Sequence, residues 1–118
     1  MNIDYFITYG FFDLNMQDSI QNFLMESFNL EFDERQSDYL GKYLVSKKNL
    51  FDKCTIEKNF VDFLEDYKEK NHTNYEGLVK FSIIKGDPND KMKLRDQVIK
   101  VIELKYPSLH LIRSREIS

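Results

Sequence analysis

Three carboxylates near the start of the chain come closest, by residue type and spacing, to a chemical site. Asp33, Glu34 and Asp38 lie within six residues of one another, and carboxylate oxygens are the ligands that hard cations such as Mg²⁺ prefer. If the three side chains converged, the chain could be a small metal-dependent enzyme. Neighbouring carboxylates are also expected by chance, because 31% of the residues are charged. The metal-dependent enzyme is therefore kept as one alternative.

The other residues that could bind a metal or act as nucleophiles are scattered. His72 and His110 are far apart in the sequence, and neither has a second Cys or His at ligand spacing. Cys54 is the only cysteine, so no intramolecular disulfide can form, and we expect a buried apolar thiol. Gly86-Asp87-Pro88 lacks the further glycines and the lysine of a phosphate-binding loop. The sequence thus predicts a binding protein with no cofactor, no metal and no catalytic activity.

Charge is divided unevenly along the chain. Residues 1–38 carry a net charge of −7, and residues 39–118 carry +4. An acidic surface repels nucleic acid and attracts basic proteins, whose association it accelerates. The late basic residues are interleaved with acids and form no aromatic ladder, so no direct binding of nucleic acid is predicted. An uneven solvated surface would give the same pattern.

Length and composition predict a single domain over residues 1–118. A chain of 118 residues can bury one hydrophobic core, and ten Phe and seven Tyr exclude a disordered chain. No apolar run reaches the roughly 18 residues that a membrane helix needs, and the N-terminus lacks the basic region of a signal peptide. We therefore expect a soluble, cytoplasmic protein.

Hydrophobic periodicity predicts most of the elements. Apolar residues at helical spacing indicate a helix from a cap at Asn15 to Asn29, and a second helix from its cap Asp87 to a stop at Pro107. Gly41 lies inside an expected strand and suggests a bulge or a close backbone approach. Alternating apolar residues predict strands over residues 3–12, 39–46, 78–84 and 109–113.

Two segments are less clear. Residues 31–38 are too polar for a core and are predicted to form a loop that leads into a strand. Residues 50–70 fit either a helix or a short strand, with a helical turn or two expected from Val61 to Lys70 in both cases. With the short strand, the order is β-α-β-β-β-α-β. That order predicts an α+β sandwich of ferredoxin-like type, with a mainly antiparallel sheet and helices on one face.

One stretch carries a more specific pattern. Residues 34–43 read Glu-Arg-x-Ser-x-Tyr-x-Gly-x-Tyr, and Cys54 then leads to Asn59 and Phe60. This run, followed by a hydrophobic strand and a capped helix, resembles immunity proteins of contact-dependent growth inhibition and related polymorphic toxin systems. Such proteins are small bacterial cytoplasmic proteins that bind one toxin domain, often a nuclease, and block it. Lys42 departs from the pattern, because a second small residue is expected after Gly41.

The resemblance implies roles for individual residues. It implies that residues 52–60 form a strand paired with residues 39–46. Positions shared among inhibitors of different toxins cannot encode recognition of one partner, so the shared motif is expected to be structural, with Arg35 bonded to Glu34 or to a tyrosine. The structural positions are Arg35, Ser37, Gly41 and Asn59. The residues expected to contact the partner are Asp18, Glu31, Asp33, Glu34, Asp38, Tyr39 and Tyr43, with Asp13 and Glu26 adding to the acidic surface.

We therefore expect an immunity protein that neutralises a cognate toxin by stoichiometric binding, as a monomer or weak homodimer. A basic nuclease domain is the expected partner, because carboxylates can occupy a cleft in which phosphates would lie. An acidic face also speeds association, which matters when the free toxin is lethal. A ferredoxin-like regulatory or small-ligand-binding module is the alternative from a different class.

Overall fold

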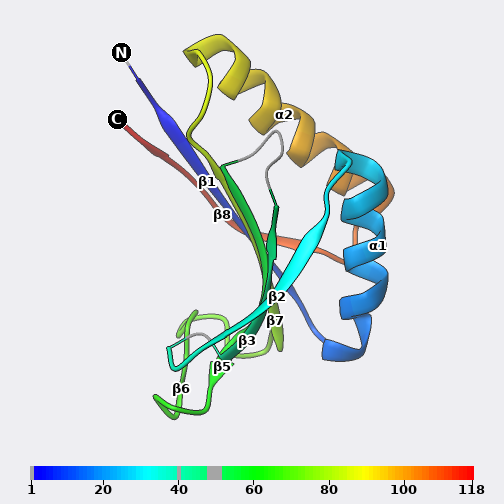
Figure 1. The fold of residues 1–118 in the computed structure, drawn as a ribbon, viewed down its shortest axis with the longest axis vertical. Helices are drawn as coiled ribbons and strands as arrows, with labels where there is room; N and C mark the ends of the chain where they lie inside the picture. Colours follow the sequence, from blue (N-terminus) through cyan, green and yellow to red (C-terminus); the bar gives the residue numbers. More distant parts are fainter. Residues whose placement is uncertain (1, 40, 48–51) are drawn as a thin grey trace.

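An antiparallel sheet with two helices on one of its faces is the framework of the molecule (Figure 1). The computed structural model describes residues 2–39, 41–47 and 52–118, and in this part of the chain six strands form the main sheet. The predicted α+β class is confirmed. The strands are β1 (Asp4–Phe11), β2 (Phe32–Ser37), β3 (Gly41–Ser46), β4 (Lys53–Lys58), β7 (Gly77–Ile83) and β8 (His110–Ile117).

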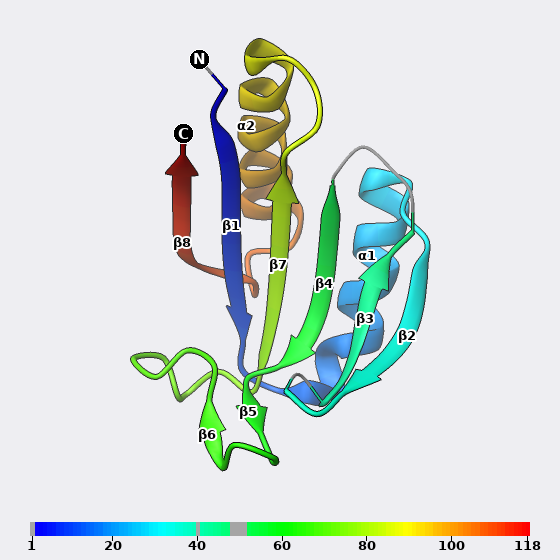
Figure 2. The ribbon, with the colours of Figure 1, turned by 60° about the vertical axis from the view of Figure 1, so that its left-hand side comes forward.

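The strands are ordered β2-β3-β4-β7-β1-β8 across the sheet. β1 lies between β7 and β8 and is antiparallel to both, and Asp4 stands opposite Ile117. The two ends of the chain therefore lie side by side at one end of the sheet, as Figures 1 and 2 show. β3 pairs with β4, as the resemblance implied for residues 39–46 and 52–60.

Local capping sets the ends of both helices, α1 (Gln17–Phe28) and α2 (Pro88–Lys105). Asp87 Oδ1 accepts from Asp90 N at 3.0 Å, so the predicted cap of α2 is confirmed. The predicted cap at Asn15 is wrong, because Asn15 lies inside a 3₁₀ turn and donates its own N–H to Asp13 Oδ1 at 2.9 Å. Asn29 ends α1 in the left-handed conformation, with φ of 53°, which Asn tolerates. Neither of these helices is long and apolar enough to cross a membrane.

The core lies between the helices and the face of the sheet that they cover, here called the helix face. The pairing register brings apolar side chains of three adjacent strands onto this face, where they meet Ile20 and Leu24 of α1 and Val98 and Ile102 of α2. Cys54 is fully buried among them, as expected, and burial raises the pKa of its thiol. The sheet contributes Tyr5, Ile7, Tyr9, Phe11, Cys54, Ile56, Val79, Phe81 and Ile83.

Two predicted elements are wrong, and both errors concern polar or solvent-facing chain. Residues 31–38 are not a loop, because residues 32–37 form β2 at the edge of the sheet. An edge strand has a neighbour on one side only and tolerates charged side chains. No helical turn forms between Val61 and Lys70, where β5 (Phe60–Val61) and β6 (Asp66–Tyr67) make a small antiparallel ladder. These extra strands distinguish the observed order from the predicted ferredoxin-like one.

The backbone conformation of Gly41, and not a close approach of another chain segment, accounts for the glycine at this position. A Cβ at Gly41 would meet no atom within 4 Å, so no close approach exists there. Its φ of +69° is the reason for glycine at this position, because other residues rarely adopt that conformation. Gly77 shows the reverse case: a Cβ there would lie 2.0 Å from Cζ of Phe11, its cross-strand partner.

Replacing Gly77 by alanine should therefore destabilise the protein. The new methyl group must displace the buried Phe11 ring or the backbone, and overpacking of this kind costs about 1–3 kcal/mol. Urea unfolding measures the loss. Ser82→Ala, in the same strand, is the matched control and should change the free energy of unfolding by less. Equal stability of Gly77→Ala and wild type would contradict the close packing of Phe11 on Gly77.

Candidate protein-binding surface

Large apolar side chains are exposed at the end of the sheet where the β2–β3 turn meets β5. Tyr39 is 67% exposed and Phe63 is 65% exposed, and their rings make an edge-to-face contact at 5.8 Å. Phe60 makes a similar contact with Tyr67 at 5.2 Å. Clustered exposed apolar side chains of this kind mark interaction surfaces. With their acidic neighbours they form the surface called here the aromatic–acidic end: Asp38, Tyr39, Phe60, Asp62, Phe63, Leu64, Glu65 and Asp66.

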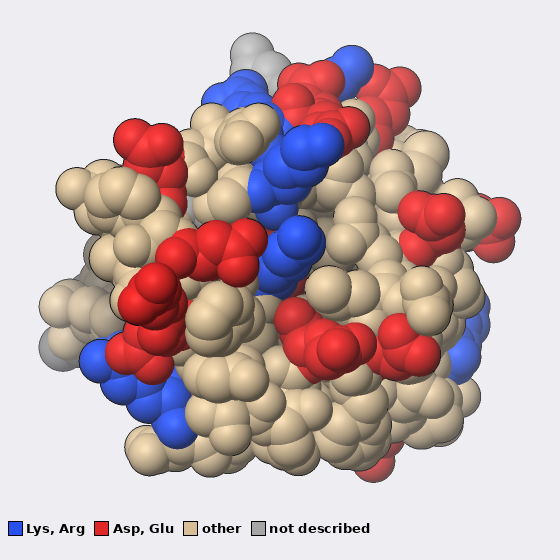
Figure 3. Space-filling view, turned by 90° about the horizontal axis from the view of Figure 1, so that it is seen from below, with Lys and Arg blue, Asp and Glu red and all other residues tan. Residues whose placement is uncertain are grey.

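Carboxylates lie on the same segments as these rings. Figure 3 looks onto this end of the molecule and shows acidic side chains distributed around a mostly uncharged surface, interrupted by a few basic ones. Asp38 comes from the β2–β3 turn, whereas Asp62, Glu65 and Asp66 come from the segment after β4. Segments far apart in the sequence therefore contribute charge of one sign to one surface.

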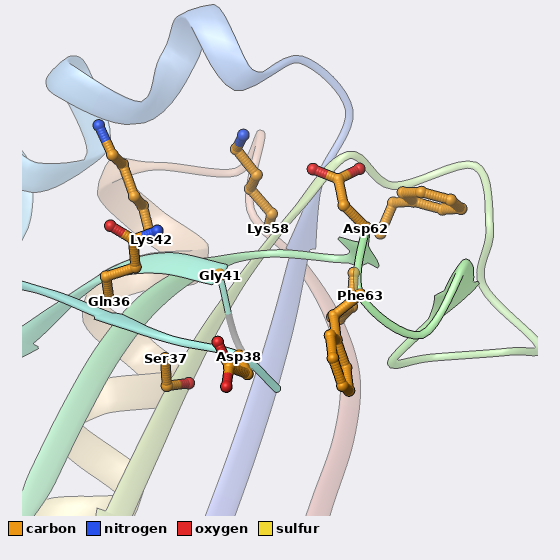
Figure 4. A pocket seen from close by; sticks show the side chains of 10 residues that line it. Gln36, Ser37, Asp38, Gly41, Lys42, Lys58, Asp62 and Phe63 are labelled. Carbon is orange, nitrogen blue, oxygen red and sulfur yellow. The ribbon is translucent and has the colours of Figure 1, made fainter.

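Two hollows flank Phe60. The turn hollow, of about 340 Å³, lies between the β2–β3 turn and β5 and is lined by Asp38, Phe60, Asp62 and Phe63 among others. In Figure 4, Lys42 and Lys58 extend to one side of it, while Ser37, Asp38 and Phe63 extend to the other.

The second hollow, called the loop hollow, measures about 500 Å³ and is lined by Phe12, Phe60, Tyr67 and Tyr75, with Asp62 and Glu76. Phe12 and Tyr75 are stacked at 4.8 Å. Aromatic faces and carboxylates together favour cationic groups, through cation–π and charge-assisted hydrogen bonds. Lys58 also lines both hollows, and Lys42 lines the turn hollow, so the linings carry charges of both signs. The rings and carboxylates are the parts of these linings that can receive arginine or lysine side chains of a basic partner.

The side chain of Asn59 holds the segment that carries these rings. Asn59 is fully buried. Its Nδ2 donates to the carbonyls of His72 at 3.0 Å and Tyr75 at 2.9 Å, and its Oδ1 accepts from Glu69 N at 2.9 Å. Its backbone adds bonds to Glu76 and Lys68. One side-chain amide thus pairs backbone groups at Glu69, His72 and Tyr75, which lie in the second half of this segment.

A buried carboxylate ties the same segment to the face of the sheet that neither helix covers, called the open face. Glu57 Oε1 lies 2.8 Å from Lys80 Nζ and 3.3 Å from Lys68 Nζ, and Glu57 Oε2 accepts from the Thr55 hydroxyl at 2.9 Å. Burial by itself would raise the pKa of Glu57, but the two ammonium groups and the hydrogen bonds from Lys80 and Thr55 lower it overall.

Lys68 and Lys80 contribute unequally to this cluster. Burial lowers the pKa of Lys68 by more than Glu57 restores, because the Lys68 side chain is only 9% exposed. Lys80 is closer to Glu57 and more exposed than Lys68, so its charged form pays a smaller desolvation penalty. The Glu57–Lys80 ion pair joins β4 to β7 within the sheet. The segment itself is attached by the Glu57–Lys68 pair, and by Glu69, which pairs with Arg113 of β8.

The structure divides the predicted partner-contacting residues into separate groups. Asp38 and Tyr39 lie in the aromatic–acidic end. Asp18 and Glu34 lie on the helix-face side and line a neighbouring hollow of about 270 Å³.

The remaining three predicted contacts also lie outside the aromatic–acidic end. Glu31 and Asp33 lie at the start of β2, remote from the turn (Figure 2), and both pair with Lys47, at 3.9 and 3.5 Å. Tyr43 is half-buried. Alternation along β3 places its side chain on the open face, opposite Arg35, and Tyr43 also borders the hollow that Asp18 and Glu34 line. The seven predicted residues therefore do not form one surface.

The expected network around Arg35 is not formed. Glu34 and Arg35 are consecutive in β2, so their side chains project to opposite faces of the sheet. Within the described residues, no ion pair or hydrogen bond joins Arg35 to Glu34 or Tyr43. The same alternation separates Asp33 from Glu34, and no group of three or more possible metal ligands occurs in the described part of the chain. Asp33, Glu34 and Asp38 therefore do not converge into the metal site considered above.

Sequence reasoning missed the residues after Asn59. Phe60, Phe63, Leu64 and Tyr67 fit a helical stripe, one of the two alternatives left open for residues 50–70, but they form no helix, and Phe63 and Leu64 are among the most exposed apolar side chains. The acids Asp62, Glu65 and Asp66 lie between these apolar residues and argue against a buried helix, because a helix of this length would have little uncharged surface to bury.

Comparison of the chain with protein-family models and with curated proteins finds no match. The resemblance of residues 34–60 to immunity proteins stays a prediction made from the motif.

Asn59→Ala should lower the free energy of unfolding by about 2–4 kcal/mol, since each buried group left unpaired costs about 1–3 kcal/mol. It should also speed amide hydrogen exchange in residues 60–76 ahead of the sheet. Urea unfolding and hydrogen exchange by mass spectrometry measure the two effects. Asn71→Ala, at an exposed position of the same segment, is the control. Unchanged exchange in Asn59→Ala would show that this amide does not hold the segment.

Glu57→Gln should reduce stability at pH 7 by about 1–3 kcal/mol, less than for a fully buried pair because Lys80 is partly exposed. A lowered carboxyl pKa stabilises the fold above the ordinary value of 4.5, and this stabilisation is lost as the pH falls below it. The difference between wild type and variant should therefore shrink between pH 5 and pH 3 in urea unfolding experiments. Glu65→Gln, at an exposed position, should show no such trend. A constant difference across this range would refute the ion-pair assignment.

Proposed function

We propose that this protein is an immunity-type inhibitor that binds a basic toxin domain stoichiometrically through the aromatic–acidic end. The observation that supports this proposal is a group of exposed aromatic rings, Tyr39, Phe60 and Phe63, on segments that also carry the exposed acids Asp38, Asp62 and Glu65. The 34–60 motif resembles immunity proteins and includes the turn that presents Tyr39. The proposal joins these two lines of support.

The exposed rings supply the affinity in this proposal. Aromatic side chains near the centre of an interface contribute most of its binding energy, because they are rigid and bury a large area. Tyr39 and Phe63 already contact each other, so little ordering of these side chains is required when a partner covers them. A surface ordered in advance binds with a smaller entropic cost.

The carboxylates supply rate and selectivity. Opposite charge raises the association rate of two proteins, which is the property an inhibitor of a lethal toxin needs. A nuclease presents lysines and arginines in the cleft that binds phosphates. Asp38 and Asp62, on the walls of the turn hollow, can replace those phosphates as ligands of the basic side chains. A basic nuclease domain is therefore the partner that we infer.

Co-expression of this protein with the toxin domain encoded beside its gene tests the proposal. Cell survival and a one-to-one complex are expected, because inhibition is stoichiometric. Death of the cells without a complex, for a toxin that kills when expressed alone, would overturn it. Size-exclusion chromatography with light scattering gives the stoichiometry.

Two sets of variants then locate the interface. Phe63→Ala should weaken the complex by about 10–100-fold, as loss of a central aromatic side chain does, whereas Leu104→Ala, an equally exposed apolar position on α2, should not. Asp38→Lys with Asp62→Lys should slow association and reduce its salt dependence. The same reversal at Glu31 and Asp33, which pair with Lys47, is the control. Equal effects of the two reversals in stopped-flow measurements would contradict this location.

A further inference from the structure

An apolar hollow lies between the C-terminal half of α2 and β8. It measures about 340 Å³, and its walls include Ile99 and Ile102 of α2, Leu109 and Leu111 beside and in β8, and Tyr9 of β1. Leu111 is half exposed and Leu109 is buried, so the hollow opens toward solvent at Leu111. This volume is in the range of small-molecule pockets. None of its lining residues belongs to the turn hollow or the loop hollow.

The hydroxyl group of Tyr9 is the unusual feature of this hollow. Tyr9 is 3% exposed, and within the described residues its Oη has no hydrogen-bond partner. Leaving a buried donor unpaired costs about 1–3 kcal/mol, so such groups are rare and call for an explanation. A phenylalanine would fill the same space without the unpaired hydroxyl, and Phe11 does so two residues later on the same face of β1.

Tyr9 lines the hollow, and its Oη is covered by neighbouring side chains rather than open to it. Tyr9 stands on the helix face, opposite Leu111 in the β1–β8 register. Its ring therefore extends from the sheet toward α2. Burial, with a smaller contribution from Glu103, raises the pKa of Tyr9 to about 12. The phenol is thus neutral and keeps its proton for donation, and its hydroxyl end lies on the side of Glu103, which also lines the hollow.

We propose that this hollow binds a compact, mainly apolar small molecule that carries a carbonyl oxygen, and that this oxygen accepts a hydrogen bond from the Tyr9 hydroxyl. The apolar walls supply the binding energy, and the single buried donor selects the ligand. Because the Oη is covered, a wall side chain must move before the ligand's oxygen can reach it, and Leu111, which is half exposed, is the apolar wall residue most free to do so. The site is independent of the aromatic–acidic end and does not rest on the proposed inhibitor function.

Two probes of nearly equal shape test the donor directly. Cyclohexanone carries a carbonyl group where methylenecyclohexane carries a carbon–carbon double bond. Each is titrated into the full chain, and the amide shifts of Ile99 and Leu111 are followed by NMR. Cyclohexanone should bind about three- to tenfold more tightly, the ratio that one neutral hydrogen bond gives. In Tyr9→Phe this preference should disappear, while methylenecyclohexane binding stays the same.

Stability measurements show whether the Tyr9 hydroxyl is unpaired in the free protein or already donates a hydrogen bond to a water molecule. Tyr9→Phe removes an unpaired buried group, so without ligand the variant should be as stable as wild type or more stable. Leu111→Trp should close the hollow and abolish binding of both probes with Tyr9 intact. The proposal is wrong if neither probe shifts these amides, if both bind equally to wild type, or if Tyr9→Phe keeps the preference. Destabilisation by Tyr9→Phe of about 1 kcal/mol would also overturn it, because the hydroxyl would then have a water partner.

Discussion

The buried amide of Asn59 is the constraint on which the functional end of this molecule depends. Its three side-chain and two backbone hydrogen bonds replace the ladder that a helix or a longer hairpin would supply. Buried backbone groups must be paired somewhere, and here one side chain pairs three of them, while the β5–β6 ladder and local turns pair others in the segment. The segment can therefore present aromatic rings to solvent, because its own fold does not depend on burying them.

The parts of the fold that were predicted correctly depend on local signals. Asp87 and Pro88 start α2 because a carboxylate cap and a proline without N–H suit the first helical turn. Alternating apolar residues define β1 and β7 because both strands have one face on the core. β2 was not predicted because its polar residues form a strand only through pairing with β3 at the edge of the sheet. This pairing depends on the tertiary fold, and neither Asp33 nor Arg35 indicates it.

Two residues of the candidate surface could be predicted because they belong to a local sequence motif. Asp38 and Tyr39 belong to a turn whose sequence carries a motif, and they lie in the aromatic–acidic end. Glu31 and Asp33 have the same charge, but Lys47 pairs with both. A sum of charges over the first 38 residues treats these acids alike. Only the fold shows that Glu31 and Asp33 lie away from Phe60 and Phe63. Pairing with a lysine does not by itself separate the two groups of acids, because Asp66 of the aromatic–acidic end pairs with Lys70 at 3.2 Å.

The two chain ends lie together at one end of the 40 Å long axis, and the aromatic–acidic end lies at the other (Figures 1 and 2). Any polypeptide joined to either terminus would leave the molecule on the side away from the exposed rings. Both termini therefore offer attachment points, for a surface-immobilisation tag or a fluorescent reporter, that leave the distal surface open to a large partner.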